Sequence, residues 1–109
     1  MVADSIVARE INIVDCSGRI RASLGYEESS ESTSLEMYDD KGLGRLQLTV
    51  AGCGHASIRI MDRDGKNLVE VFAFETPRHG IVISSHDGEP VIVQVVHPDG
   101  QSQIEAFRQ

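Results

Sequence analysis

The sequence of 109 residues contains no tryptophan, two cysteines, three prolines and only 5% aromatic residues. The two cysteines, Cys16 and Cys53, are too few for the disulfide framework that holds many small secreted domains together. Because aromatic residues are scarce and are not interleaved with basic ones, the sequence argues against a stacking surface for single-stranded nucleic acid.

The sequence also lacks an excess of positive charge and long hydrophobic runs. Ten basic against 17 acidic side chains give a net charge of −7, which disfavours nucleic acid and anionic membranes as partners. No segment approaches the roughly 20 apolar residues of a membrane helix. The first ten residues lack the basic and apolar regions of a secretory signal. We therefore expect a cytoplasmic protein.

Sequence motifs for nucleotide binding and hydrolysis are missing. The sequence has no Gly-x-Gly-x-x-Gly, no phosphate-binding loop and no Gly-x-Ser-x-Gly. The four histidines do not occur at the His-x-His or His-x-x-x-His spacing of metal sites. The Asp-containing turns lack the alternating carboxylates and final Glu of a calcium loop. We expect no cofactor and no metal ion, and a protein without enzymatic activity is favoured.

What the sequence does contain is typical of β-strands. Ile and Val together number 21, against six Leu, and β-branched side chains favour strands over helices. Apolar residues alternate with polar ones throughout, and no segment shows sustained helical spacing. Apolar residues make up 40% of the chain, as in ordinary folded domains. The sequence predicts an all-β fold.

A repeat of about 23 residues organises the chain. Four segments read apolar-x-apolar-x-Asp-x-x-Gly, with Ser85 in place of the fourth Asp: 11–18, 35–42, 58–65 and 81–88. A second, mostly alternating run follows each Gly. Because Asp and Gly favour tight turns, each repeat is interpreted as a β-hairpin. We expect one domain, 1–109, with repeats at about 6–26, 32–51, 57–75 and 80–97 and a tail at 98–109.

The alternation predicts which side chains face a common core: Ile11, Ile13, Leu35, Met37, Ile58, Ile60, Ile81 and Ile83. The intervening Asn12, Glu36 and Arg59 are expected on the outside. Eight short strands can form a small barrel, a sandwich or a propeller-like assembly. The medium-sized aliphatic residues favour a filled interior.

The extended pattern apolar-x-apolar-x-Asp-x-x-Gly-x-x-Arg-x-x-apolar resembles a loosely defined group of uncharacterised bacterial repeat proteins. Arg21 and Arg45 match its Arg, whereas Leu68 and Val91 stand at the later positions. The resemblance covers most of residues 6–96 and implies a repeat architecture without an assigned chemistry.

The segments between and after the repeats allow several interpretations. Gly25–Ser34 is acidic and rich in Ser, and is expected to be a mobile loop. His97–Gly100 is a further turn signal, and the residues after it fit either a strand or one turn of helix. If the hairpins run up and down, one end of the fold collects a candidate small-molecule site: Tyr26, Cys53, His55, Arg78 and His79.

Two segments have apolar residues on both strand faces: Val91–Val96, and the end of Val69–Phe74. A strand buried on both faces needs a second covering layer, which another copy of the chain could supply. We therefore expect a homo-oligomer with a contact near Phe72, Phe74, Val93 and Val95. The favoured function is a protein-interaction module. The alternatives are a small-molecule-binding protein or minor hydrolase, and a structural assembly subunit.

Overall fold

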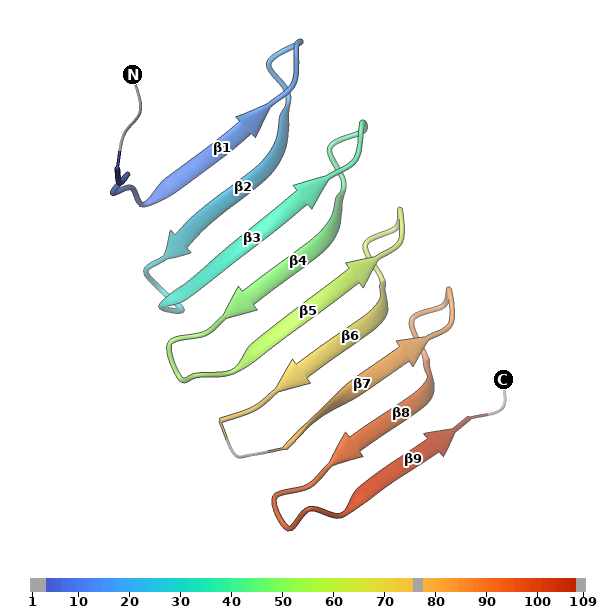
Figure 1. Cartoon of the computed structure of the whole chain (residues 1–109). Coiled ribbons are helices and arrows are strands. Elements are labelled where there is room, and N and C mark those ends of the chain that lie inside the picture. Colours follow the sequence, from blue (N-terminus) through green and yellow to red (C-terminus); the bar gives the residue numbers. More distant parts are fainter. Residues whose placement is uncertain (1–3, 76–77, 108–109) are drawn as a thin grey trace.

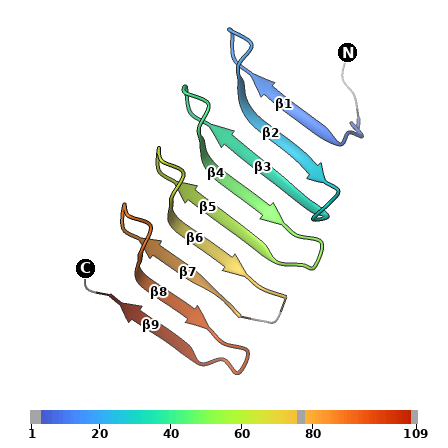
Figure 2. The same ribbon diagram turned by 180° about the vertical axis from the view of Figure 1, so that it is seen from behind.

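The computed structural model describes residues 4–75 and 78–107, which form an antiparallel β-sheet and no helix (Figures 1 and 2). None of these residues belongs to a helix able to cross a membrane. The strands are β1 (Glu10–Val14), β2 (Ile20–Glu27), β3 (Ser32–Tyr38), β4 (Gly44–Val50), β5 (Ala56–Met61), β6 (Asn67–Ala73), β7 (His79–Ser84), β8 (Pro90–Val96) and β9 (Ser102–Ala106).

The strands follow one another across the sheet in sequence order, as a meander. This confirms the all-β fold built from consecutive hairpins. The expected barrel is wrong, because β1 and β9 lie at opposite sides of an open sheet and do not pair (Figure 1). No second layer covers the sheet within 4–75 and 78–107, so the chain alone is neither a sandwich nor a propeller. Each strand pairs only with the strands that precede and follow it in the sequence, and the sheet stays open.

The register places equivalent aliphatic residues on one face of the sheet. Leu24 lies opposite Leu35, Leu35 opposite Leu48, and the row continues across the next strands. We call this the aliphatic face; its central residues are Ile11, Ile13, Ala22, Leu24, Leu35, Met37, Leu46, Leu48, Ile58, Ile60, Val69, Val71, Ile81, Ile83, Ile92 and Ile104. Asn12, Glu36 and Arg59 lie on the opposite face, as the alternation predicted.

The aliphatic face is exposed, so the expected dry interior is wrong for the isolated chain. Ile13, Met37, Ile60 and Ile83 keep 59, 45, 45 and 40% of their surface accessible. The chain exposes 8137 Å², whereas a compact monomer of 11.9 kDa is expected to expose about 5,900 Å². Its radius of gyration is 16.8 Å, against about 13 Å for a compact domain of this length.

The turns follow the repeat. At each of the four expected turns the Gly has a φ between 82° and 87° and donates its N–H to the first turn residue: Gly18, Gly42, Gly65 and Gly88. A register shift precedes each turn, as in a type I turn followed by a bulge. The same hydrogen bond and a positive φ recur at Gly54 and Gly100, on the other end of the sheet.

Two of the sequence interpretations outside the repeats are settled by the strand bounds. The expected loop Gly25–Ser34 is too long, because β2 runs to Glu27 and β3 begins at Ser32, which leaves residues 28–31 as the turn. Gly25, Tyr26 and Glu27 pair with Ser34, Thr33 and Ser32. The tail forms strand β9 instead of a helical turn, and it pairs with β8.

Among the described residues Phe72 alone is buried, at 9% exposure. It lies on the face opposite the aliphatic one, directly across from Gly80 in β7. Its ring stacks on Phe74 with centroids 4.7 Å apart. Since Gly80 has no side chain, the ring of Phe72 has room above β7. A Cβ atom at position 80 would lie 2.1 Å from the backbone oxygen of Gln94.

Gly80→Ala is therefore expected to lower the free energy of unfolding by about 1–3 kcal/mol, because the backbone of β7 and β8 must separate to admit the methyl group. Urea unfolding measures the change. Gly25→Ala is the matched control: it lies in a strand, and its new Cβ would approach nothing closer than 3.7 Å. Equal stability of the two variants would contradict the close packing at Gly80.

Candidate functional site

The end of the sheet that carries the links between hairpins holds several of the candidate site residues. We call it the linker end. The imidazole of His55 lies 5.0 Å from the ring of Phe74, centroid to centroid. The guanidinium of Arg78 lies over the same ring, 5.2 Å from its centroid. The structure thus brings His55 and Arg78 together through Phe74, which connects them to the buried Phe72.

Three potential metal ligands also meet at the linker end. One ligand atom from each of Cys53, His55 and Glu75 lies within 4.8 Å of the other two, and all three residues are exposed. Cys53 and His55 flank Gly54 in the turn between β4 and β5, and Glu75 follows β6. The sequence analysis did not single out Glu75. A meander order brings the link after β4 beside the link after β6. From that order, Glu75 could have been predicted to lie near Cys53 and His55.

Tyr26 and His79 lie apart from that cluster. Tyr26 pairs with Thr33 in β3 and lines a separate polar hollow with Arg9, Glu10 and Tyr38. His79 pairs with Ala73 and with Val96. This register places His79 on the aliphatic face, whereas Phe72 and Phe74 belong to the opposite one. The five residues proposed as one small-molecule site therefore divide among three places.

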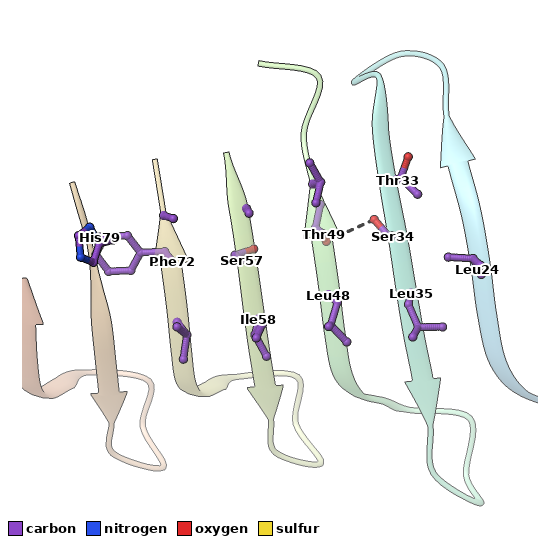
Figure 3. A pocket seen from close by; sticks show the side chains of 14 residues that line it. Leu24, Thr33, Ser34, Leu35, Leu48, Thr49, Ser57, Ile58, Phe72 and His79 are labelled. Atoms are coloured by element: carbon purple, nitrogen blue, oxygen red, sulfur yellow. Dashed lines mark hydrogen bonds between the residues drawn. The ribbon is translucent and has the colours of Figure 1, made fainter. Parts of the chain in front are cut away.

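A shallow apolar groove of about 570 Å³ crosses the aliphatic face. Leu24, Leu35, Leu48 and Ile58 form a row across four neighbouring strands along it, and His79 lies at its far end (Figure 3). The register leaves no Asp, Glu, Lys or Arg on this face within the described strands. The face offers dispersion contacts and apolar burial, with the imidazole of His79 at its margin.

The residues expected at an oligomer contact lie on the opposite face. Phe72 lies across from Gly80, and Gly80 across from Val95. Val82 and Val93 form the next row. Towards the N-terminus the same rows continue as polar residues, among them Ser34 and Thr49, whose hydroxyls are 3.3 Å apart (Figure 3). This face is thus apolar at Phe72 and along β7 and β8, whereas Glu70 in β6 and Glu105 in β9 share the row of Val82 and Val93.

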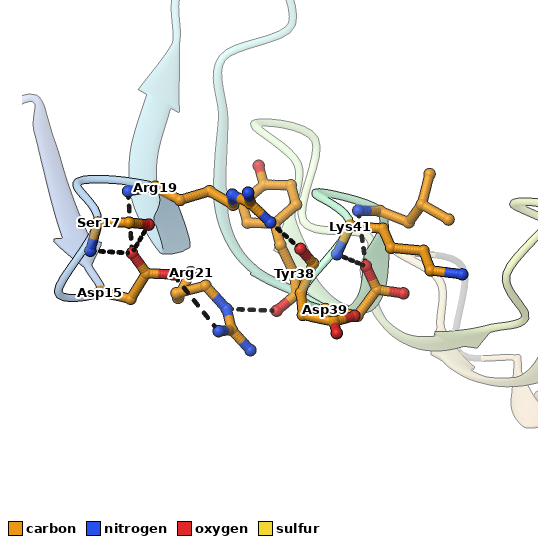
Figure 4. A network of polar contacts seen from close by, with 9 residues as sticks. Asp15, Ser17, Arg19, Arg21, Tyr38, Asp39 and Lys41 are labelled. Carbon is orange, nitrogen blue, oxygen red and sulfur yellow. Dashed lines mark hydrogen bonds and ion pairs between the residues drawn. The ribbon is translucent and has the colours of Figure 1, made fainter.

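The other end of the sheet, which we call the Asp-turn end, is held by side-chain hydrogen bonds. Oδ1 of Asp15 accepts the backbone N–H groups of Ser17 and Arg19, at 2.9 and 3.1 Å, and the Ser17 hydroxyl at 2.7 Å (Figure 4). Asp39 and Asp62 accept equivalent N–H groups two and four residues later. These contacts explain the Asp of the repeat as turn chemistry.

The Arg of the repeat connects neighbouring hairpins. Nε of Arg21 donates to the backbone oxygen of Tyr38, the last residue of β3, and its Nη1 lies 3.6 Å from Asp15 (Figure 4). Nε of Arg45 donates to the backbone oxygen of Met61 at 2.7 Å, and its Nη1 lies 3.6 Å from Asp39. Each Arg therefore joins its own turn to the next hairpin. The exposed ion pairs add little energy by themselves.

The carboxylates of the repeat are stabilised in their charged form. Hydrogen bonds from the Ser17 hydroxyl and the Arg19 backbone lower the pKa of Asp15 to about 2. The backbone N–H of Leu43 lowers the pKa of Asp39, and that of Lys66 lowers the pKa of Asp62.

The fourth turn departs from this pattern. Ser85 replaces Asp, and its buried hydroxyl has no hydrogen-bond partner within residues 4–75 and 78–107. The backbone bonds of the turn remain, from Gly88 N–H to the Ser85 oxygen and from Ser85 N–H to the Glu89 oxygen, both at 2.9 Å.

No protein-family model matches this sequence, and no curated protein matches it either.

Ser85→Asp is expected to raise the free energy of unfolding by about 1 kcal/mol, because the carboxylate can accept turn N–H groups as Asp15, Asp39 and Asp62 do. Urea unfolding at neutral pH measures the gain. Ser85→Ala removes a hydroxyl that bonds nothing, and it is expected to leave stability nearly unchanged. A loss of stability in the Asp variant would show that the fourth turn cannot adopt the geometry of the other three.

The pKa of Asp15 in the folded state, about 2, lies below the ordinary value of 3.8. Its contribution is therefore complete above pH 4 and is lost as the pH falls towards 2. The triple variant Asp15→Asn, Asp39→Asn, Asp62→Asn keeps an acceptor oxygen but cannot titrate. We expect its stability to fall less steeply than wild type between pH 4 and 2, by urea unfolding.

The matched control for acid unfolding is Asp40→Asn with Asp64→Asn, two exposed neighbours in the same turns. Their carboxylates accept no turn hydrogen bond in the described part of the chain. This double variant is expected to keep the acid sensitivity of the wild type. A triple variant that also kept it would contradict the assigned role of the turn carboxylates.

Proposed function

We propose that this chain is a protein-interaction module that acts as a homodimer, in which the aliphatic faces of two copies pack against each other. The carrying observation is the exposed aliphatic face itself. Ordering about 100 residues costs on the order of 100 kcal/mol or more of conformational entropy. That cost is offset mainly by apolar burial, and among the described residues Phe72 alone is buried.

The exposed area is large enough for a contact with a second copy of the chain. The chain exposes 8137 Å², about 2,200 Å² more than the roughly 5,900 Å² expected for a compact monomer of its mass. A standard interface buries about 800 Å² per partner, and obligate dimers bury more. Covering one complete sheet face therefore suits an obligate contact better than a transient one.

The chemistry of the face supports self-association over a charged partner. Within the described strands the aliphatic face carries no Asp, Glu, Lys or Arg, and with His79 neutral two copies can meet without like-charge repulsion or buried ions. The side chains of this face are mostly Ile, Leu and Val, whose similar sizes allow two facing sheets to interdigitate. Two sheets packed face to face form a sandwich with a layer spacing of about 10 Å. The sandwich that the sequence suggested for one chain would then consist of two chains, each contributing one sheet.

The contact proposed here differs from the residues that the sequence suggested. Phe72 is 9% exposed already, so it has little further surface to lose. Phe74 contacts His55 and Arg78, and Val93 and Val95 lie on a mostly polar face, directly across from Glu105 and Gln103. We assign these four residues to packing within the chain and the aliphatic face to the dimer.

A second candidate, a subunit of a larger structural assembly, is supported by the outer strands. All five residues of β1 and all five of β9 are exposed. Unpaired strand edges can add a strand from another chain. This candidate predicts species larger than a dimer. As part of the proposal we retain the cytoplasmic location, which agrees with the two exposed free cysteines.

Sedimentation of the purified chain is expected to give twice the mass of 11.9 kDa. Its thermal midpoint is expected to rise with protein concentration, since unfolding of an obligate dimer is concentration-dependent. A folded monomer with a constant midpoint would overturn the dimer, and species that grow beyond it would favour the assembly.

Leu48→Glu tests which face is used. Leu48 lies between Leu35 and Ile58 at the centre of the aliphatic face. Because twofold symmetry buries the new carboxylate twice, we expect at least a hundredfold weaker association, or unfolding at a concentration where wild type is folded. Thr49→Glu, the neighbour on the opposite face, is the control and is expected to remain dimeric, because its cross-strand partners are Ser34 and Ser57 and the new carboxylate can accept the Ser34 hydroxyl. A Leu48→Glu dimer as stable as the control would place the contact elsewhere.

A further inference from the structure

The linker end carries a cluster that the dimer does not use. Cys53, His55 and Glu75 offer a sulfur, an imidazole nitrogen and a carboxylate oxygen that lie within 4.8 Å of one another. Ligand atoms around a tetrahedral zinc ion are about 3.5 Å apart, given bond lengths of about 2.0–2.3 Å. A small rotation of exposed side chains is enough to close that difference. We propose that these three residues bind one divalent zinc ion, independently of dimer formation.

The backbone of the turn fixes the first two ligands relative to each other. The Gly54 N–H donates to the Ala51 oxygen at 2.9 Å, and the Ala51 N–H donates to the His55 oxygen at 2.8 Å. Gly54 has a φ of 98°, a conformation that glycine adopts without strain. This hydrogen-bonded turn fixes the backbone positions of Cys53 and His55 relative to each other. The ligands are therefore brought together by folding, not by their spacing alone.

The third ligand comes from the neighbouring link. Residue 75 directly follows Phe74, whose ring contacts His55 at 5.0 Å. Phe74 in turn stacks on the buried Phe72, so the aromatic pair holds the His55 ring beside the segment that carries Glu75. A bound ion would join the link after β4 to the link after β6, across the end of β5.

The donor set selects the kind of ion. Thiolate and imidazole are preferred by zinc and other borderline transition metals, whereas magnesium and calcium prefer oxygen ligands. The thiolate and the carboxylate together neutralise a divalent cation, and the Cys53 thiol releases its proton on binding. Three protein ligands leave the fourth position for water, as in open zinc sites. Water can reach this fourth position, because all three residues are exposed.

The test uses the full chain, reduced with a phosphine and stripped of metal. Zinc is titrated by calorimetry, and cobalt(II) is titrated by absorption, because a thiolate ligand gives cobalt a charge-transfer band. We expect one zinc ion per chain, a raised thermal midpoint with zinc and not with magnesium, and tetrahedral cobalt absorption.

Three ligand variants and two controls decide the assignment. Cys53→Ser is expected to abolish the cobalt charge-transfer band, and His55→Ala and Glu75→Gln are each expected to weaken zinc binding more than tenfold. Cys16→Ser removes the other exposed cysteine, at the Asp-turn end, and His97→Ala removes a histidine from a different turn. Both controls are expected to bind zinc as wild type does.

Three results would overturn the site: no zinc binding at micromolar concentrations, binding that all three ligand variants retain, or equal loss in the Cys16→Ser control. Circular dichroism of each metal-free variant checks that a loss of binding is not a loss of folding. Sedimentation of the metal-free wild type separates this proposal from the dimer, since a monomer that binds zinc would overturn only the dimer.

Discussion

The exposed aliphatic face is the constraint on which the remainder of this structure depends. A sheet of one layer satisfies its backbone hydrogen bonds but leaves both faces accessible to solvent. Here the strands pair only with their sequence neighbours, so each hairpin adds its own aliphatic residues to a face that nothing in residues 4–75 and 78–107 covers. The hydrogen bonds define the shape of the sheet, and the apolar surface must supply most of its stability.

The repeat explains how a short chain makes such a regular face. The Asp turns fix the hairpin, and Arg21 and Arg45 attach each of the first two hairpins to the next one. Leu68 and Val91 replace the later Arg residues. In that half of the chain the stacked rings of Phe72 and Phe74 lie above the sheet instead. Polar connections between hairpins thus give way to apolar packing from the N-terminal to the C-terminal half.

Local patterns in the sequence were sufficient for the hairpins and insufficient for their assembly. Apolar alternation and the Asp-x-x-Gly turns predicted the strand pairs and the shared face, because both depend on residues a few positions apart. Whether β1 pairs with β9 depends on the curvature of the whole sheet, which cannot be predicted from any short segment of the sequence. The loop expected at Gly25–Ser34 was too long because, within that segment, Tyr26 and Thr33 are the only residues with apolar character that mark the ends of the two strands.

The candidate sites show the same division between local and non-local information. Cys53 and His55 were noticed because they are neighbours in sequence, but Glu75 joins them through the placement of two links on the same sheet end. His79 was grouped with them although strand parity places it on the aliphatic face. Face and end are thus separate surfaces of one sheet. Two sheets of a sandwich can pack face to face while the links at their ends stay open to solvent, so the proposed metal site at the linker end is compatible with the proposed dimer.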